Sequence, residues 1–125
     1  MTGTTLDSGA LIAFERGSAR MQALVERATD HRLTLAVPAG VVAQTWRGGV
    51  RQARLSRLLS APISEIVPLD ELAARAVGVL CARSGATDVV DASVVVCARE
   101  RSHQVVSSDP NDLLAIDHRL RVAAP

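Results

Sequence analysis

Two aspartates of this chain stand where a strand-like stretch gives way to a helix-like one. Asp7 follows Thr4-Thr5-Leu6, whose residue types suit a strand, and precedes residues 10–15, which carry apolar side chains at helical spacing. Asp109 follows a later strand-like stretch, residues 104–107. The carboxyl ends of parallel strands meet at one edge of an open sheet, where such sheets bind their ligands. If the two strands are neighbours, the two carboxylates are neighbours too.

Further aspartates lie at the starts of predicted helices. Asp88 and Asp91 are three residues apart in the first turn of one predicted helix, so they share a face. Asp112 follows Asp109 by three residues. A helix start beside the two strand ends would add Asp91 to Asp7 and Asp109. Helix capping is the ordinary alternative for any aspartate in such a position, and it accounts for Asp88 and Asp112 as well as a role in a site does.

Three ionised carboxylates packed together repel one another strongly in a cleft of low dielectric constant. A divalent cation is the simplest way to make such a cluster tolerable. Oxygen ligands without histidine or cysteine select a hard ion, Mg²⁺ or Mn²⁺. Such an ion can activate water and stabilise the charge that develops on a phosphodiester during displacement. The acids therefore predict a metal site for phosphodiester chemistry.

The amino-acid composition argues against several kinds of binding partner and enzyme. With 125 residues and 48% hydrophobic content, the chain should form a single domain, residues 1–125. All 14 basic residues are arginines, and aromatic residues make up only 2%. Few aromatics argue against recognition of nucleic acid by base stacking, so a grip on RNA would come from arginine on phosphate. The lack of lysine disfavours a phosphoacceptor signalling domain, and Gly9 stands where an aspartate-nucleophile phosphatase expects its second aspartate.

Strand-like and helix-like stretches alternate along the chain, which predicts an α/β fold. Strands are expected at residues 4–6, 33–37, 64–67 and 104–107, with a fifth, edge strand within 119–123. Helices are expected at residues 10–15, 18–28, from 38 to about 48, 51–59, 71–83 and from 88 to about 101. This order indicates a central, mostly parallel sheet of four to five strands with helices on both faces.

Several side chains are expected to be buried because they lie in apolar helical patterns. In the helix at 71–83, the apolar residues expected to face inward are Leu72, Ala76, Val79 and Leu80. Cys81 and Cys97 lie in apolar helical patterns, so we expect free, buried thiols.

The remaining polar and aromatic candidates have separate expectations. The histidines expected at the surface are His31, His103 and His118. Trp46 is expected in the core or an interface. No signal peptide or membrane-spanning run is visible, which predicts a cytoplasmic protein without a membrane partner.

Three motifs together resemble a known family. They are Thr5-Leu6-Asp7-Ser8-Gly9-Ala10-Leu11, then Asp91-Ala92-Ser93 with Cys97-Ala98-Arg99, then Val106-Ser107-Ser108-Asp109-Pro110-Asn111-Asp112-Leu113. In this order they look like the acidic motifs of PIN-domain ribonucleases and, more narrowly, of the VapC toxins of bacterial toxin–antitoxin pairs. The resemblance implies a PIN-like three-layer sandwich and a Mg²⁺-dependent endoribonuclease, with Mn²⁺ as a possible substitute. It also implies a homodimer inhibited by a VapB-like antitoxin, with Asp7, Asp91 and Asp109 as catalytic metal ligands.

One position departs from the family pattern. The helix after the second strand usually carries a glutamate, and here the matching residue is Gln44. An amide oxygen can coordinate a metal ion, but it brings no charge and cannot act as a base. An alternative therefore stays open: a catalytically weak or degenerate module that binds RNA or an antitoxin without cutting.

Other polar residues near the motifs are candidates for supporting roles. Gln44, Asp88, Asp112 and Ser8 are candidate further ligands or residues that orient the ligands. Ser107 and Ser108 could also orient the carboxylates, although such serines more often satisfy turns. Arg47 is the candidate for a contact with an RNA phosphate.

Overall fold

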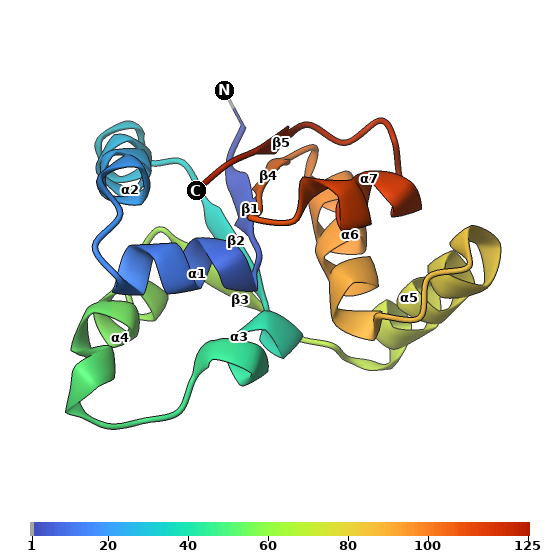
Figure 1. Ribbon diagram of the computed structural model, residues 1–125, viewed down its shortest axis with the longest axis horizontal. Helices are drawn as coiled ribbons and strands as arrows, with labels where there is room; N and C mark the ends of the chain where they lie inside the picture. Colours follow the sequence, from blue (N-terminus) through green and yellow to red (C-terminus); the bar gives the residue numbers. More distant parts are fainter. Residues whose placement is uncertain (1) are drawn as a thin grey trace.

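The computed structural model describes residues 2–125, which form one five-stranded sheet with helices on both sides (Figure 1). All strands run parallel, in the order β3-β2-β1-β4-β5. The strands are β1 (Thr4–Leu6), β2 (Leu35–Pro38), β3 (Ser64–Val67), β4 (Gln104–Val106) and β5 (Val122–Ala123). The helices are α1 (Ser8–Glu15), α2 (Ala19–His31), α3 (Ala39–Thr45), α4 (Ala53–Leu59), α5 (Glu71–Ser84), α6 (Val89–Arg101) and α7 (Pro110–Ile116), with a short 3₁₀ turn, η1 (Val50–Gln52). The predicted fold class is confirmed.

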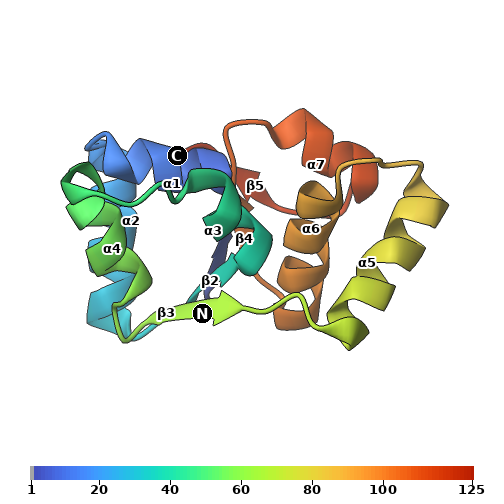
Figure 2. The same cartoon turned by 90° about the horizontal axis from the view of Figure 1, so that it is seen from below.

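Two groups of helices sandwich the sheet, with α1, α2 and α4 on one side and α5, α6 and α7 on the other (Figure 2). Strands covered on both faces need apolar residues throughout rather than in alternation. β1 and β2 are accordingly buried at every position. No helix in residues 2–125 is long and apolar enough to cross a membrane.

The register between β1 and β4 brings their ends level. Leu6 pairs with Val106, and the backbone N–H of Asp7 donates to the carbonyl of Val106 over 3.2 Å. The residues that follow the two strands therefore leave the sheet side by side. This arrangement places the first and third acidic motifs at one edge of the sheet.

Helix α6 is buried on nearly every side, as its alanines and valines predict. Its fully covered residues are Ala92, Val94, Val95, Cys97 and Ala98. It contacts β1, β2 and β4 on one side and α5 on the other. The first turn of α6, which carries Asp91, is therefore fixed relative to the strand ends.

The inward face predicted for α5 is wrong in part. Leu72 and Val79 are 82% and 50% exposed, whereas Val77 is buried. The helix carries apolar residues around most of its circumference, so spacing alone does not select the side that packs on α6. The thiol prediction holds for Cys97, which is free and buried, but Cys81 is free and only half-buried.

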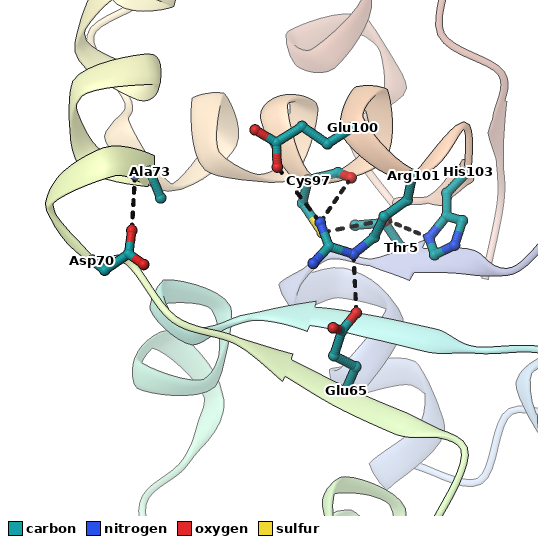
Figure 3. A network of polar contacts seen from close by, with 8 residues as sticks. All are labelled: Thr5, Glu65, Asp70, Ala73, Cys97, Glu100, Arg101 and His103. Atoms are coloured by element: carbon teal, nitrogen blue, oxygen red, sulfur yellow. Dashed lines mark hydrogen bonds and ion pairs between the residues drawn. The ribbon is translucent and has the colours of Figure 1, made fainter.

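His103 differs from its prediction, and Trp46 lies outside the core, which leaves an interface as its predicted place. His103 is half-buried, and its Nδ1 lies 3.1 Å from Thr5 Oγ1 within the polar network of Figure 3. Burial, and then the charge of Arg101, lower the pKa of His103. Trp46 is 40% exposed and is not a core residue, because it follows α3 in the segment that leads away from the sheet.

Helix boundaries shift where short elements depend on tertiary contacts. Helix α7 is not predicted from the sequence, because its seven residues include the turn formers Pro110, Asn111 and Asp112. The stretch predicted as one helix at 51–59 is divided into η1 and α4. Pro38 is predicted to start a helix, but it is the last residue of the second strand, β2.

One buried side chain holds the segment between α3 and α4. The Gln52 amide oxygen accepts hydrogen bonds from the backbone N–H groups of Arg47 and Gly48, at 2.6 and 2.9 Å. Its amide nitrogen donates to the Thr45 carbonyl and to Glu15 of α1, at 2.7 and 2.9 Å. Four hydrogen bonds satisfy the donors and acceptors of a primary amide. The segment is thus tied to α1.

Candidate metal and nuclease site

Asp7 is held rigidly at the end of β1. Its side chain is buried, and Oδ1 accepts a hydrogen bond of 3.0 Å from the backbone N–H of Ala10, which caps α1. Capping and a site role are therefore compatible for this residue. Burial raises the pKa of Asp7, a nearby Asp109 raises it further, and hydrogen bonds from Ser107 and the backbone oppose the shift.

Ser107 connects the first and third motifs. It is buried directly after β4, and it hydrogen-bonds to the Asp7 carboxylate. Its Oγ also accepts a 2.9 Å hydrogen bond from the backbone N–H of Asp109. The hydroxyl therefore fixes the orientation of one carboxylate and the backbone that carries another, which is the orienting role considered for this serine.

The acids converge electrostatically on Asp91. Its pKa is raised to about 6, first by burial and then by the negative charges of four other aspartates, Asp88, Asp112, Asp7 and Asp109. Asp91 is half-buried in the first turn of α6, where Asp88 caps the helix by accepting from the Asp91 N–H over 3.0 Å. Asp109 and Asp112 are exposed around the start of α7. All three acidic motifs therefore contribute to one negatively charged region.

Close packing holds the first and third motifs together. A Cβ atom built on Gly9 would overlap Ser108 Oγ and lie 2.8 Å from Ser108 Cβ and 3.1 Å from Ser108 N. Residue 9 must therefore lack a side chain for α1 to approach the segment before Asp109. From the sequence, Gly9 is predicted only as a turn or cap residue. The close contact between α1 and Ser108 depends on tertiary packing, which a local sequence pattern does not reveal.

The remaining candidates are placed as follows. Gln44 is exposed near the end of α3, which packs against α1 and α6. The Arg47 guanidinium folds back, and its Nη1 donates to the carbonyls of Ala43 and Trp46 at 3.0 and 2.8 Å. It thereby satisfies carbonyls at the end of α3. Ser8 is the half-buried first residue of α1.

The donor set suits a hard divalent cation, because every converging group is a carboxylate. Within residues 2–125, however, no three histidine, cysteine, aspartate or glutamate side chains form a finished coordination group. Asp7 is held by a hydrogen bond to the start of α1, whereas Asp109 is exposed. Burial first, and then neighbouring negative charge, raise the pKa of Asp91, and a cation would offset that charge.

The comparison with protein families decides the identification. The model of the PIN domain matches residues 4–118 of the chain. The chain belongs to the PIN-domain family. PIN domains as a family are nucleases that generally use divalent metal ions. No curated protein matches the chain in sequence.

Solved structures agree with this PIN fold. VapBC2 from Rickettsia felis bound to a promoter DNA fragment is similar with a TM-score of 0.71 and 16% identity, covering 97% of both chains. DNA-bound VapBC from Salmonella typhimurium gives a TM-score of 0.70 at 16% identity, covering 99% of this chain and 98% of that one. FitAcB from Neisseria gonorrhoeae gives 0.63 at 19% identity, covering 95% of each chain. At these identities the likeness establishes the fold.

Proposed function

We propose that this PIN domain is the toxin of a type II toxin–antitoxin system and a cytoplasmic, Mg²⁺-dependent endoribonuclease. The observation that carries the proposal is the convergence of four other aspartates on the half-buried Asp91, at the carboxyl edge of a parallel sheet. Such an edge is where open α/β sheets bind ligands. The likeness to the VapBC and FitAcB structures supports the toxin–antitoxin part of the proposal.

In this proposal Asp7, Asp91 and Asp109 hold the cation. When bound, Mg²⁺ supplies Lewis-acid stabilisation of the phosphodiester and a lowered pKa for attacking water. Asp7 is the fixed ligand, because Ala10 N–H and Ser107 orient it. Asp109 is positioned through its backbone by Ser107. Asp88 and Asp112 add negative charge without direct coordination, and Ser8 follows Asp7 as the first residue of α1.

A second candidate is a PIN module that binds RNA or an antitoxin without cutting. The neutral Gln44 on α3, in place of a fourth carboxylate, favours it. A cleavage assay with single-stranded RNA at increasing Mg²⁺ or Mn²⁺ distinguishes the two. Metal-dependent hydrolysis supports the enzyme, and RNA binding without hydrolysis at saturating metal supports the module.

Changing Gln44 to glutamate should strengthen metal binding. In a partly solvated site one more negative charge near the ion strengthens the attraction for the cation, and we expect a gain of roughly tenfold in Mn²⁺ affinity. Gln44→Ala should weaken binding more mildly. Titration calorimetry measures both, with Gln22→Glu on α2 as the control for added surface charge. Unchanged affinity in both Gln44 variants would remove this residue from the site.

The proposed toxin should also bind a VapB-like antitoxin, as the named complexes indicate for their own chains. We further propose that a second copy packs on the exposed apolar face of α5. Leu72 and Val79 border a hollow of about 570 Å³ between α5 and α6, which Ala76 and Val96 also line. Exposed apolar surface of this kind marks interfaces.

Replacing Leu72 and Val79 together with glutamate should convert the dimer to a monomer, because the paired charges would be buried against one another. Sedimentation or light scattering at micromolar concentration measures the change. Val50→Glu, at a 92% exposed apolar position between α3 and α4, is the matched control and should leave the dimer intact. A wild-type protein that stays monomeric would contradict the dimer and leave the antitoxin proposal standing.

A further inference from the structure

A second charged cluster lies at the opposite end of the molecule from the acidic site. Helix α6 begins beside the acids and spans 13 residues, Val89–Arg101, so its ends are about 20 Å apart. At the far end an open hollow of about 420 Å³ is bordered by α6, by the segment after α7 and by the residues before β5. Its polar lining residues are Arg99, Ser102, His103, Asp117, Arg119 and Arg121.

A buried carboxylate organises this hollow. Asp117 is only 7% exposed in its side chain, and its Oδ1 accepts a 2.9 Å hydrogen bond from the backbone N–H of Arg119. Arg119 Nε lies 3.3 Å from Asp117 Oδ1, and Arg99 Nε lies 3.5 Å from Oδ2. One carboxylate therefore anchors guanidinium groups from two separate segments. Burial raises the pKa of Asp117, but these hydrogen bonds and charges outweigh it and lower the pKa overall, so the anchor stays ionised at neutral pH.

The anchored arginines keep donors available for another anion. In both pairs the atom closest to Asp117 is Nε, so the terminal Nη groups lie farther from the carboxylate. The side chains of Arg99 and Arg119 are 46% and 71% exposed, which leaves them accessible from solvent. With Arg121, three arginines face one aspartate, and two positive charges remain uncompensated. Guanidinium groups in fixed orientation are suited to the paired oxygens of a phosphate.

The basic surface continues beyond this hollow. Arg121 also borders a neighbouring hollow of about 660 Å³ at the amino ends of β1 and β2, where Arg27 and Gln104 contribute further polar groups. Two adjoining hollows that share an arginine suit successive phosphates of a chain better than one small anion. Recognition through phosphates also suits a protein with only two aromatic residues, Phe14 and Trp46, for stacking on bases.

We propose that the Asp117-anchored arginines form a phosphate-binding exosite, which holds the backbone of a single-stranded RNA whose other end reaches the acidic site. The proposal rests on the nuclease function proposed above, and it adds where the substrate is gripped. The acidic site repels RNA, whereas the exosite attracts it. Affinity for RNA should therefore depend on the arginines, and cleavage should depend on the aspartates.

The test measures RNA binding separately from cleavage. A fluorescently labelled 12-nucleotide single-stranded RNA is titrated with metal-free protein in EDTA, where no hydrolysis occurs, and the dissociation constant is followed against salt concentration. Arg119→Gln combined with Arg121→Gln should weaken binding at least about tenfold at 50 mM salt. The slope of log K against log salt should fall by about 1.4, which corresponds to two phosphate contacts on a single strand.

Two further variants test whether a loss of RNA binding comes from the exosite itself or from a general change in charge or folding. Arg121→Gln alone leaves both ion pairs to Asp117 in place, so it tests the exosite without disturbing the buried carboxylate; it should weaken binding about threefold. Arg57→Gln, which removes an exposed arginine from α4, is the matched control and should change binding less than twofold. Unfolding temperatures verify that each variant is folded.

The outcomes separate this proposal from the proposed function. Equal RNA affinity in the double variant and the Arg57→Gln control would overturn the exosite, whether or not the protein cleaves RNA. Preferential binding of a 12-residue polyglutamate peptide would overturn it in favour of an acidic protein partner. Arginine-dependent RNA binding without metal-dependent cleavage would support the exosite and reject the nuclease.

Discussion

Replacing Asp7 with asparagine should lower metal-dependent RNA cleavage at least about 100-fold while leaving the protein folded. Changes to groups that merely orient metal ligands already cost 10–100-fold, and Asp7 is the proposed ligand that Ala10 N–H and Ser107 hold in place. Asparagine keeps the oxygen that caps α1. Initial rates on RNA at saturating Mg²⁺ measure the loss, and Mn²⁺ calorimetry should show the matching loss of affinity.

The pH dependence of stability gives an independent check on Asp7→Asn. Because burial raises the pKa of Asp7 in the folded protein, ionisation of this group opposes folding at pH values above its unfolded pKa. Below that pKa the group is protonated in both states and the effect disappears. Metal-free Asp7→Asn should therefore be at least as stable as the wild type at pH 7–8, and any advantage should diminish toward pH 3.

Asp70 provides a matched control for the same substitution. Its Oδ1 caps α5 by accepting a 2.9 Å hydrogen bond from Ala73 N–H, as Figure 3 shows, in the same manner as Asp7 caps α1. The charges with the largest effect on the pKa of Asp91 come from other aspartates. Asp70→Asn should change cleavage less than about twofold. If Asp70→Asn and Asp7→Asn had equal effects, Asp7 would be a helix cap and nothing more.

Gly9→Ala should reduce cleavage at least about tenfold by moving the backbone that carries Asp109. Alanine in a helix is worth about 1 kcal/mol over glycine, whereas overpacking costs typically 1–3 kcal/mol. Here the added Cβ would meet both the side chain and the backbone of Ser108. The collision should therefore exceed the gain, and a displacement of about 1 Å at a reacting centre can cost roughly 100-fold in rate.

A compensating substitution tests this explanation. Ser108→Gly removes the Oγ and Cβ atoms that the new methyl group would strike and leaves only the backbone nitrogen at 3.1 Å. The double variant Gly9→Ala, Ser108→Gly should recover most of the cleavage rate and metal affinity lost by the single variant. Ser108→Gly alone is the control for added flexibility. Failure of the double variant to recover would mean that residue 9 acts through something other than this contact.

Sequence reasoning located β1 and β3 because strand bounds depend on local rules, and the metal-binding role of the acids stays a prediction. β1 and β3 have the predicted bounds, since residues 4–6 and 64–67 are strand-like and end at clear breaks. Asp7 and Asp109 follow strands, and Asp91 follows a helix start, so the topology of a parallel sheet is enough to bring them together. The PIN resemblance drew on the same positions.

The features that sequence reasoning missed depend on which surfaces meet. Leu72 and Val79 are exposed because α5 touches the molecule mainly through α6, and nothing in the helix itself records that. The contact between Gly9 and Ser108 joins residues 99 positions apart, and so does not produce a local pattern. Asp117 and Arg99 likewise come together only when α7 lies beside α6.

The amide of Gln52 has a consequence for molecular recognition. By securing the segment after α3 to Glu15 and Thr45, it holds the backbone that carries the exposed residues Trp46 and Val50. A protein that binds this segment loses little conformational entropy of the PIN domain, because the segment is already ordered before contact. The rate of association with this segment should therefore be limited by encounter and desolvation rather than by a slow folding step. This holds although the segment contains two consecutive glycines, Gly48 and Gly49.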